Sequence, residues 1–191
     1  MVKGPAYPNI HQDLIDLCRQ GNREAQFRIY KLYYKAMYNT SLRIVKDPAE
    51  AEDIMQESFL SAFQKLGTYS GSVSFGAWLK KIVVNRSIDS VKRQRMYFEE
   101  LDERIAEDIR EEAGEEEVTI DAARIRDAIM QLPGGFRIVL SLYLLEGYDH
   151  EEIGQILEIT SSTSRSQYAR ARQKLLEILK RNGKSGEAYK G

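Results

Sequence analysis

The sequence has little of what disulfide-bonded, zinc-binding or membrane-spanning proteins require. It holds one cysteine, Cys18, among 191 residues, which excludes an internal disulfide and any multi-cysteine zinc site. We expect Cys18 to be a half-buried helix residue. No stretch approaches the roughly 18 apolar residues of a membrane span, and the first residues lack the apolar segment of a signal peptide. The composition therefore predicts a cytoplasmic protein that does not insert into a membrane.

Patterns typical of enzymes are also missing. The two histidines, His11 and His150, are far apart, no glycine-rich phosphate loop is present, and no serine or cysteine lies in a nucleophile motif. The carboxylates Glu50, Glu52, Asp53 and Glu57 could bind a metal, but a helix bundle that does so generally adds a Glu-x-x-His pair, which is lacking. We expect no catalytic residue, no metal and no cofactor.

Prolines are few, and apolar residues follow a helical period. Only four prolines are present, and between residues 14 and 66 apolar side chains recur at intervals of three and four, as in helices that pack on one another. Asp47 and Pro48 predict a helix start, with Glu50 at the capping-box position. A basic helix is expected from Phe75 to about Met96. The first segment is thus predicted to be a bundle of about four helices.

The net charge of −1 hides a strong segregation of charge. Residues 99–121 contain twelve acidic residues and two arginines, a net of −10, so the remainder of the chain carries +9. This acidic stretch has the composition of a solvated linker. We expect an all-α protein of two helical domains, residues 1–98 and 122–191, joined by the acidic linker 99–121.

The second domain has the pattern of a helix-turn-helix. Helices are expected at 122–132 and 136–145, and Asp149 with Glu152 forms a capping box before a short helix. Gly154 allows close approach by a neighbour, residues 158–160 form a brief turn, and a final helix runs from Ser161 to about Lys180. Five of its side chains are expected to face inward: Tyr168, Ala171, Leu175, Leu176 and Leu179.

Two basic helices suit nucleic acid. The final helix carries Arg165 and Arg170 among Ser and Gln, side chains that hydrogen-bond base edges and phosphates; the alternative is a solvated amphipathic helix. The other basic helix follows the loop 69–75, whose aromatic and small residues suit an unstacked base. Taken alone, Phe75 and Trp78 are expected to be core residues rather than contacts to nucleic acid.

The motifs resemble the sigma-70 family of bacterial transcription initiation factors, in particular the extracytoplasmic-function (ECF) sigma factors. Residues 47–59 (DPAEAEDIMQESF) and 75–79 (FGAWL) are similar to the region 2 signature. Region 4 features follow in order: Leu132-Pro133, Arg137, Glu146-Gly147, 151–153 (EEI), Ile156-Leu157, Thr163, 170–172 (RAR) and Leu175.

The resemblance implies a sigma factor that binds core RNA polymerase and directs initiation at promoters. Polymerase contacts, at the clamp coiled coil, would come from Asp53, Gln56, Glu57 and Phe59; an acidic, partly apolar face suits a basic protein partner. The minus-10 element would be recognised and melted by Tyr69, Ser70, Phe75, Lys80, Asn85, Arg86 and Arg93. The minus-35 element would be bound by Thr163, Arg165, Ser166, Gln167 and Arg170. The second domain would also bind the polymerase flap, and an anti-sigma factor is an expected partner.

The sequence departs from the family at two places. Glu158 stands where the region 4 turn usually has Gly, and residues 164–169 read SRSQYA where the family often has VKSRLH, so base preferences at minus-35 do not carry over. The acidic linker would thread the polymerase interior toward the RNA exit path, or serve only as a tether. Two other functions stay open at this point: a stand-alone helix-turn-helix regulator and a helical metal-dependent hydrolase.

Overall fold

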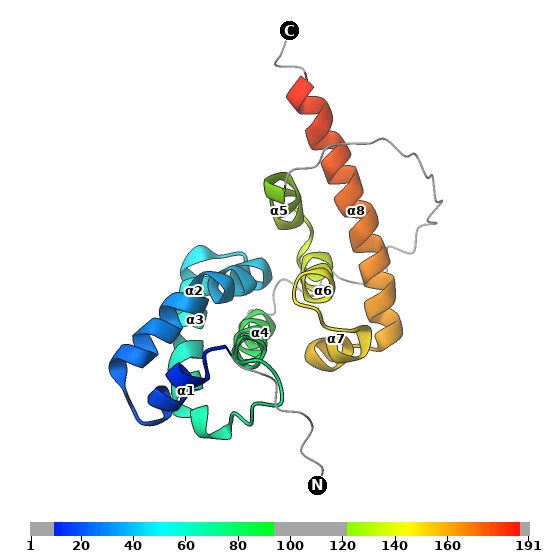
Figure 1. Cartoon of the computed structure of the whole chain (residues 1–191). Helices are drawn as coiled ribbons and strands as arrows, with labels where there is room; N and C mark the ends of the chain where they lie inside the picture. The colour runs from blue at the N-terminus through cyan, green and yellow to red at the C-terminus, as the bar shows by residue number, and fades with distance from the viewer. Residues whose placement is uncertain (1–9, 94–121, 188–191) are drawn as a thin grey trace. The chain divides into compact units, whose positions relative to one another are not determined.

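The computed structural model describes residues 10–93 and 122–187, and within these residues every regular element is helical. The chain divides into two compact units between Arg93 and Gln94 (Figure 1). The predicted all-α class with two helical domains is confirmed, whereas the acidic linker 99–121 and the helix end near Met96 lie outside the described residues. No helix in the described part is both long and apolar enough to cross a bilayer.

The first unit is a bundle built around one long helix. In it, α2 packs against α1, α3 and α4, and α3 also packs against α4. The predicted bundle of about four helices is confirmed. The bounds of its elements are α1 Gln12–Arg19, α2 Arg23–Val45, α3 Pro48–Gln64, the short 3-10 helix η1 Leu66–Thr68, and α4 Phe75–Arg93.

The α2–α3 connection is tight because each residue in it has a local role. Lys46 ends α2 in the left-handed region at φ 70°. The Asp47 side chain then accepts a hydrogen bond of 2.8 Å from the Glu50 backbone N–H, and Pro48 occupies the first turn of α3, where its missing N–H costs nothing. The predicted helix start is confirmed. The Glu50 carboxylate also accepts a hydrogen bond from the Ser90 hydroxyl on α4.

The core of the first unit is rich in aromatic rings. Phe75 is 1% exposed, and its ring centroid lies 5.5 Å from that of Tyr33 and 5.7 Å from that of Trp78. Phe75 is therefore a core residue, and Trp78 is partly buried beside it. Cys18 is buried rather than half-buried, because α1 turns it toward this core, and burial raises the pKa of its thiol.

The second unit is formed by α5 Ala122–Met130, α6 Gly134–Leu144, α7 His150–Leu157 and α8 Ser161–Glu187. The long helix α8 packs against all three shorter helices. The buried Arg137 on α6 donates a hydrogen bond of 3.2 Å to the Leu132 carbonyl, which fixes α6 to the turn after α5. Burial lowers the pKa of this guanidinium.

Helix α8 differs from the prediction in its length and in one inward residue. It continues to Glu187, beyond the expected end at Lys180. Gly183 and Gly186 lie within this extension, and glycine weakens a helix without stopping it. Ala171, Leu175 and Ile178 are buried at successive helical turns, whereas Leu176 is 48% exposed. A buried stripe through residues 171, 175 and 178 turns position 176 to the side.

Candidate nucleic-acid and polymerase interfaces

The short helix α7 is fixed at its start by a complete capping box. The Asp149 carboxylate accepts hydrogen bonds of 2.8 Å from the backbone N–H groups of Glu151 and Glu152. In return, the Glu152 carboxylate accepts one of 2.9 Å from the Asp149 N–H. The capping box predicted from the sequence is confirmed. It lets a helix of 8 residues keep a defined direction in front of α8.

The turn between α7 and α8 is close-packed. Glu158 has φ 59° and ψ 40°, the left-handed conformation, at the position where the family usually has glycine. A Cβ added to Gly154 would lie 2.8 Å from the Ile159 carbonyl oxygen, so the close approach expected at Gly154 is confirmed. Thr160 then starts α8: its hydroxyl accepts a hydrogen bond of 3.0 Å from the Thr163 N–H, a cap that the sequence reading missed.

A ring cluster holds α6, α7 and α8 together. The imidazole of His150 stacks on Tyr143 with centroids 4.5 Å apart, and Tyr143 lies 4.6 Å from Tyr168. The His150 Nδ1 lies 2.9 Å from the Oγ of Ser164, which is fully buried. His150 is thus the first residue of α7, as expected, and it also bridges to α8. No local pattern marked Ser164 as a core residue, because its partner is 14 positions away.

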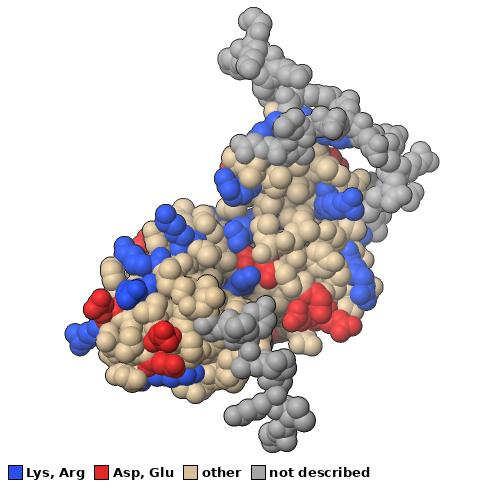
Figure 2. Space-filling view, in the orientation of Figure 1, with Lys and Arg blue, Asp and Glu red and all other residues tan. Residues whose placement is uncertain are grey.

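The five predicted minus-35 residues all lie in the first turns of α8. Thr163, Arg165 and Ser166 are exposed, and Gln167 and Arg170 are half-buried. The Arg165 guanidinium donates to the Ser161 hydroxyl at 3.1 Å. Figure 2 shows Lys and Arg side chains spaced along the surface over α8 and acidic side chains close to α7. This arrangement offers exposed hydrogen-bond donors and positive charge at a helix N-terminus.

The loop 69–74 of the first unit lies over aromatic side chains. Tyr69 is 3% exposed, and its hydroxyl donates a hydrogen bond of 2.7 Å to the Val73 carbonyl, which closes the loop. Ser70, Ser72 and Val73 are exposed. Of the residues assigned to the minus-10 element, Ser70 therefore faces solvent, whereas the Tyr69 and Phe75 rings lie beneath the loop and support it.

The polar residues assigned to minus-10 on α4 do not share one face. Arg86 and Arg93 lie seven positions apart on one side of the helix, but Lys80 is turned by about 120° from Arg86. Asn85 and Arg93 are exposed, and Lys80 and Arg86 are half-buried. The Arg86 guanidinium forms an ion pair of 2.7 Å with the Glu57 carboxylate on α3. A predicted DNA contact is therefore paired with a predicted polymerase contact.

Of the predicted polymerase contacts on α3, Phe59 is buried, and the leucine next to it is exposed. Phe59 is 3% exposed and packs on Tyr30 with ring centroids 5.0 Å apart. Leu60 is 63% exposed and follows Asp53 by seven positions, so it shares the face of Gln56 and Glu57. We call Asp53, Gln56, Glu57 and Leu60 the α3 face. The sequence shows Leu60 at helical spacing from three polar residues, but only the packing of α3 shows that Leu60 is exposed and Phe59 buried.

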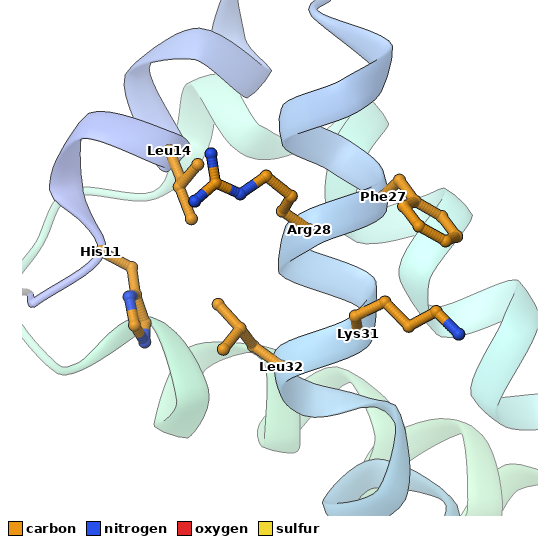
Figure 3. Close-up of a pocket in the computed structure, with 6 residues that line it drawn as sticks. All are labelled: His11, Leu14, Phe27, Arg28, Lys31 and Leu32. Atoms are coloured by element: carbon orange, nitrogen blue, oxygen red, sulfur yellow. The ribbon is translucent and has the colours of Figure 1, made fainter.

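A shallow groove between α1 and α2 lies apart from these surfaces (Figure 3). Its volume is about 370 Å³, and the Lys31 ammonium lies 5.3 Å from the centre of the Phe27 ring. The groove offers apolar surface and positive charge but no carboxylate. Among the described residues, no three His, Cys, Asp or Glu side chains come together as metal ligands. The lining residues are His11, Leu14, Phe27, Arg28, Lys31 and Leu32.

Comparison with known families finds matches in both units. Residues 29–96 match the model of Sigma-70 region 2, and residues 122–175 match that of Sigma-70, region 4. The RNA polymerase sigma-H factor of Pseudomonas aeruginosa is 30% identical, with 88% of this chain and 93% of that protein aligned. The ECF RNA polymerase sigma factor SigM of Bacillus subtilis is 27% identical, over 80% of this chain and 94% of that protein.

Solved structures share the fold. The sigma factor RpoE of Bartonella quintana, solved with the anti-sigma factor NepR, superposes with a TM-score of 0.52 at 22% identity, covering 80% of this chain and 95% of that one. CnrH, solved with the cytosolic domain of CnrY, gives 0.54 at 21% identity, with 89% and 97% covered. Because both regions match in order and relatives align along most of the chain, a stand-alone helix-turn-helix regulator is not favoured. The chain belongs to the sigma-70 family and is an ECF sigma factor, an RNA polymerase subunit that directs the initiation of transcription.

Proposed function

We propose that this sigma factor directs initiation through three surfaces, two of them for promoter DNA and one for polymerase. The first turns of α8 bind the minus-35 element, the loop 69–74 with α4 binds the minus-10 element, and the α3 face binds the polymerase clamp coiled coil. The main support for the proposal is the geometry of the second unit. Helix α7 is capped, the turn that follows it is tight, and the N-terminal face of α8 is exposed. The domain limits 1–98 and 122–191, with an acidic linker between them, belong to the same proposal.

At minus-35, the N-terminal part of α8 enters the major groove. The groove admits one helix, and an arginine with serine neighbours can bind base edges and phosphates together. The positive end of the helix dipole lies toward the phosphates. Arg165 is the principal contact in this proposal, because it is exposed and, within the residues that the structure describes, its guanidinium donates to the Ser161 hydroxyl on its own helix.

At minus-10, the loop 69–74 captures a base that has left the duplex. Ser70, Ser72 and Val73 offer exposed side chains on the loop, and Arg86 and Arg93 hold the backbone of the separated strand. Capturing an unstacked base offsets part of the few kcal/mol lost on unpairing, so melting proceeds without hydrolysis. Members of this family are non-catalytic initiation factors, and we propose the same for this chain.

The α3 face suits a protein partner better than DNA. Carboxylates would repel phosphates, whereas they attract a basic protein surface, and Leu60 adds an apolar contact at its end. Region 4 binds the polymerase flap in the same proposal. RpoE and CnrH were solved with proteins that bind them, and we propose that an anti-sigma factor also controls this chain, in the cytoplasm where polymerase and promoter meet.

The test is promoter-dependent transcription with the core polymerase of the same organism. Arg165→Ala should weaken binding to a duplex minus-35 element by a factor of about 5 to 160, the effect of losing one base-reading arginine worth about 1–3 kcal/mol, and should reduce the salt dependence of binding by about one phosphate contact. Arg126→Ala, which removes an exposed arginine from α5, is the matched control. Equal effects of the two substitutions would contradict the proposal.

A further inference from the structure

Arg19, the last residue of α1, reaches a segment 50 positions away. One nitrogen of its guanidinium, Nη1, contacts the Asp16 carboxylate at 2.8 Å. The other, Nη2, donates a hydrogen bond of 2.9 Å to the backbone carbonyl of Tyr69. Asp16 thereby orients the planar guanidinium, and a charged donor makes the bond to Tyr69 stronger than a neutral one.

Tyr69 is fixed by three kinds of contact. Its ring lies 5.6 Å from Phe75 and 5.3 Å from Trp78, measured between centroids. Its hydroxyl closes the loop 69–74 on the Val73 carbonyl, and its own carbonyl is held by Arg19. Arg19 is the contact in this set that comes from α1, so it ties the first helix of the bundle to the first residue of the loop.

We propose that Arg19 is a positioning residue for promoter melting: it holds the Tyr69 carbonyl so that the loop 69–74 is ready to receive a base before DNA arrives. The inference rests on the proposed function of that loop. A loop already held in its binding conformation loses less conformational entropy on binding. Lysine can replace arginine only in part here, because its ammonium is a single centre that can bind the carboxylate or the carbonyl but cannot span both as the guanidinium fork does.

The experiment uses the holoenzyme and two forms of one promoter, a full duplex and the same DNA already unpaired from minus-10 to the start site. Arg19→Ala should slow open-complex formation on the duplex about tenfold, a change of about 1.4 kcal/mol, and change initiation on the unpaired template less than twofold. Arg19→Lys should give an intermediate loss, with an unchanged melting temperature. Arg23→Ala, which removes an exposed arginine four positions later, is the matched control.

A third variant separates this inference from the function on which it rests. Gly71 has φ +75°, a conformation that a β-branched residue cannot adopt without strain, so Gly71→Val distorts the loop itself. Loss of duplex melting by both Arg19→Ala and Gly71→Val supports the inference. Loss by Gly71→Val alone, or an equal loss on both templates by Arg19→Ala, overturns it and leaves the loop's function standing. Full activity of both variants overturns the loop's function as well.

Discussion

Removing the charge of Glu57 should strengthen binding of single-stranded minus-10 DNA by the free chain. Glu57 holds Arg86 in an ion pair of 2.7 Å, and the two side chains are 63% and 38% exposed. An exposed pair of this kind contributes about 0.2–1 kcal/mol. Glu57→Gln releases Arg86 to contact phosphate, and the affinity should therefore rise by a factor of about 1.4 to 5.

The assay is fluorescence anisotropy of a labelled single strand with the full-length chain, at low and at high salt. The gain should be largest at low salt, since salt screens both the ion pair and the phosphate contact. Asp53→Asn is the matched control, because it removes the same charge from the same face one turn earlier without touching Arg86. The same Glu57→Gln variant should bind core polymerase more weakly.

The double variant decides whether the gain passes through Arg86. In an Arg86→Ala background, Glu57→Gln should bring no further increase, because the released cation is gone. A gain of the same size in that background would refute the reasoning, and so would an equal gain from Asp53→Asn. Either result would mean that the lost negative charge acts on DNA at a distance and that the pair itself has no role.

Three further predictions concern the second unit. Glu158→Gly should raise the free energy of unfolding by up to about 1 kcal/mol in chemical denaturation, since glycine adopts the left-handed conformation without strain; a lower value would show that the glutamate side chain contributes more than the strain costs. Gly154→Ala should lower it by about 1–3 kcal/mol and weaken minus-35 binding, because the new methyl group forces the Ile159 carbonyl away; unchanged stability would contradict the tight turn. Burial, helped by Glu146 and Glu152, raises the pKa of Tyr148 to about 12, so folding stability should fall as pH rises from about 10 to 12. Phenolate absorbance of wild type against Tyr148→Phe checks this, and ionisation of Tyr148 near pH 10 would contradict it.

Helix starts could be predicted from the sequence because their chemistry is local. Asp47 with Pro48, and Asp149 with Glu152, satisfy backbone N–H groups within three positions of themselves, and such spacing is visible without a fold. The same holds for Gly154, where a small residue inside the short helix α7 indicated a close approach by a neighbour. Fold class and the helix-turn-helix followed from these local signals together with the apolar period.

Which apolar residue faces outward could not be read from the sequence alone. Phe59 and Leu60 are neighbours, and the helix turns about 100° between them, so only the packing of α3 against α2 decides that Phe59 is buried and Leu60 exposed. Tyr69 and Phe75 were assigned to DNA for their aromatic character. In the structure both side chains are buried in the core, because a small helical unit needs large apolar side chains at its centre.

The contact between Glu57 and Arg86 joins positions far apart in the sequence and would couple the two proposed partners of the first unit. If polymerase binds at Glu57 and DNA at Arg86, as we propose, polymerase bound at Glu57 leaves Arg86 available to DNA. Linkage is reciprocal, so DNA bound at Arg86 would then strengthen the polymerase contact at Glu57 by the same factor, about 1.4 to 5 from one exposed pair. That factor is too small to prevent DNA binding by the free chain, and because the coupling is reciprocal it would make the two binding events cooperative without favouring either order.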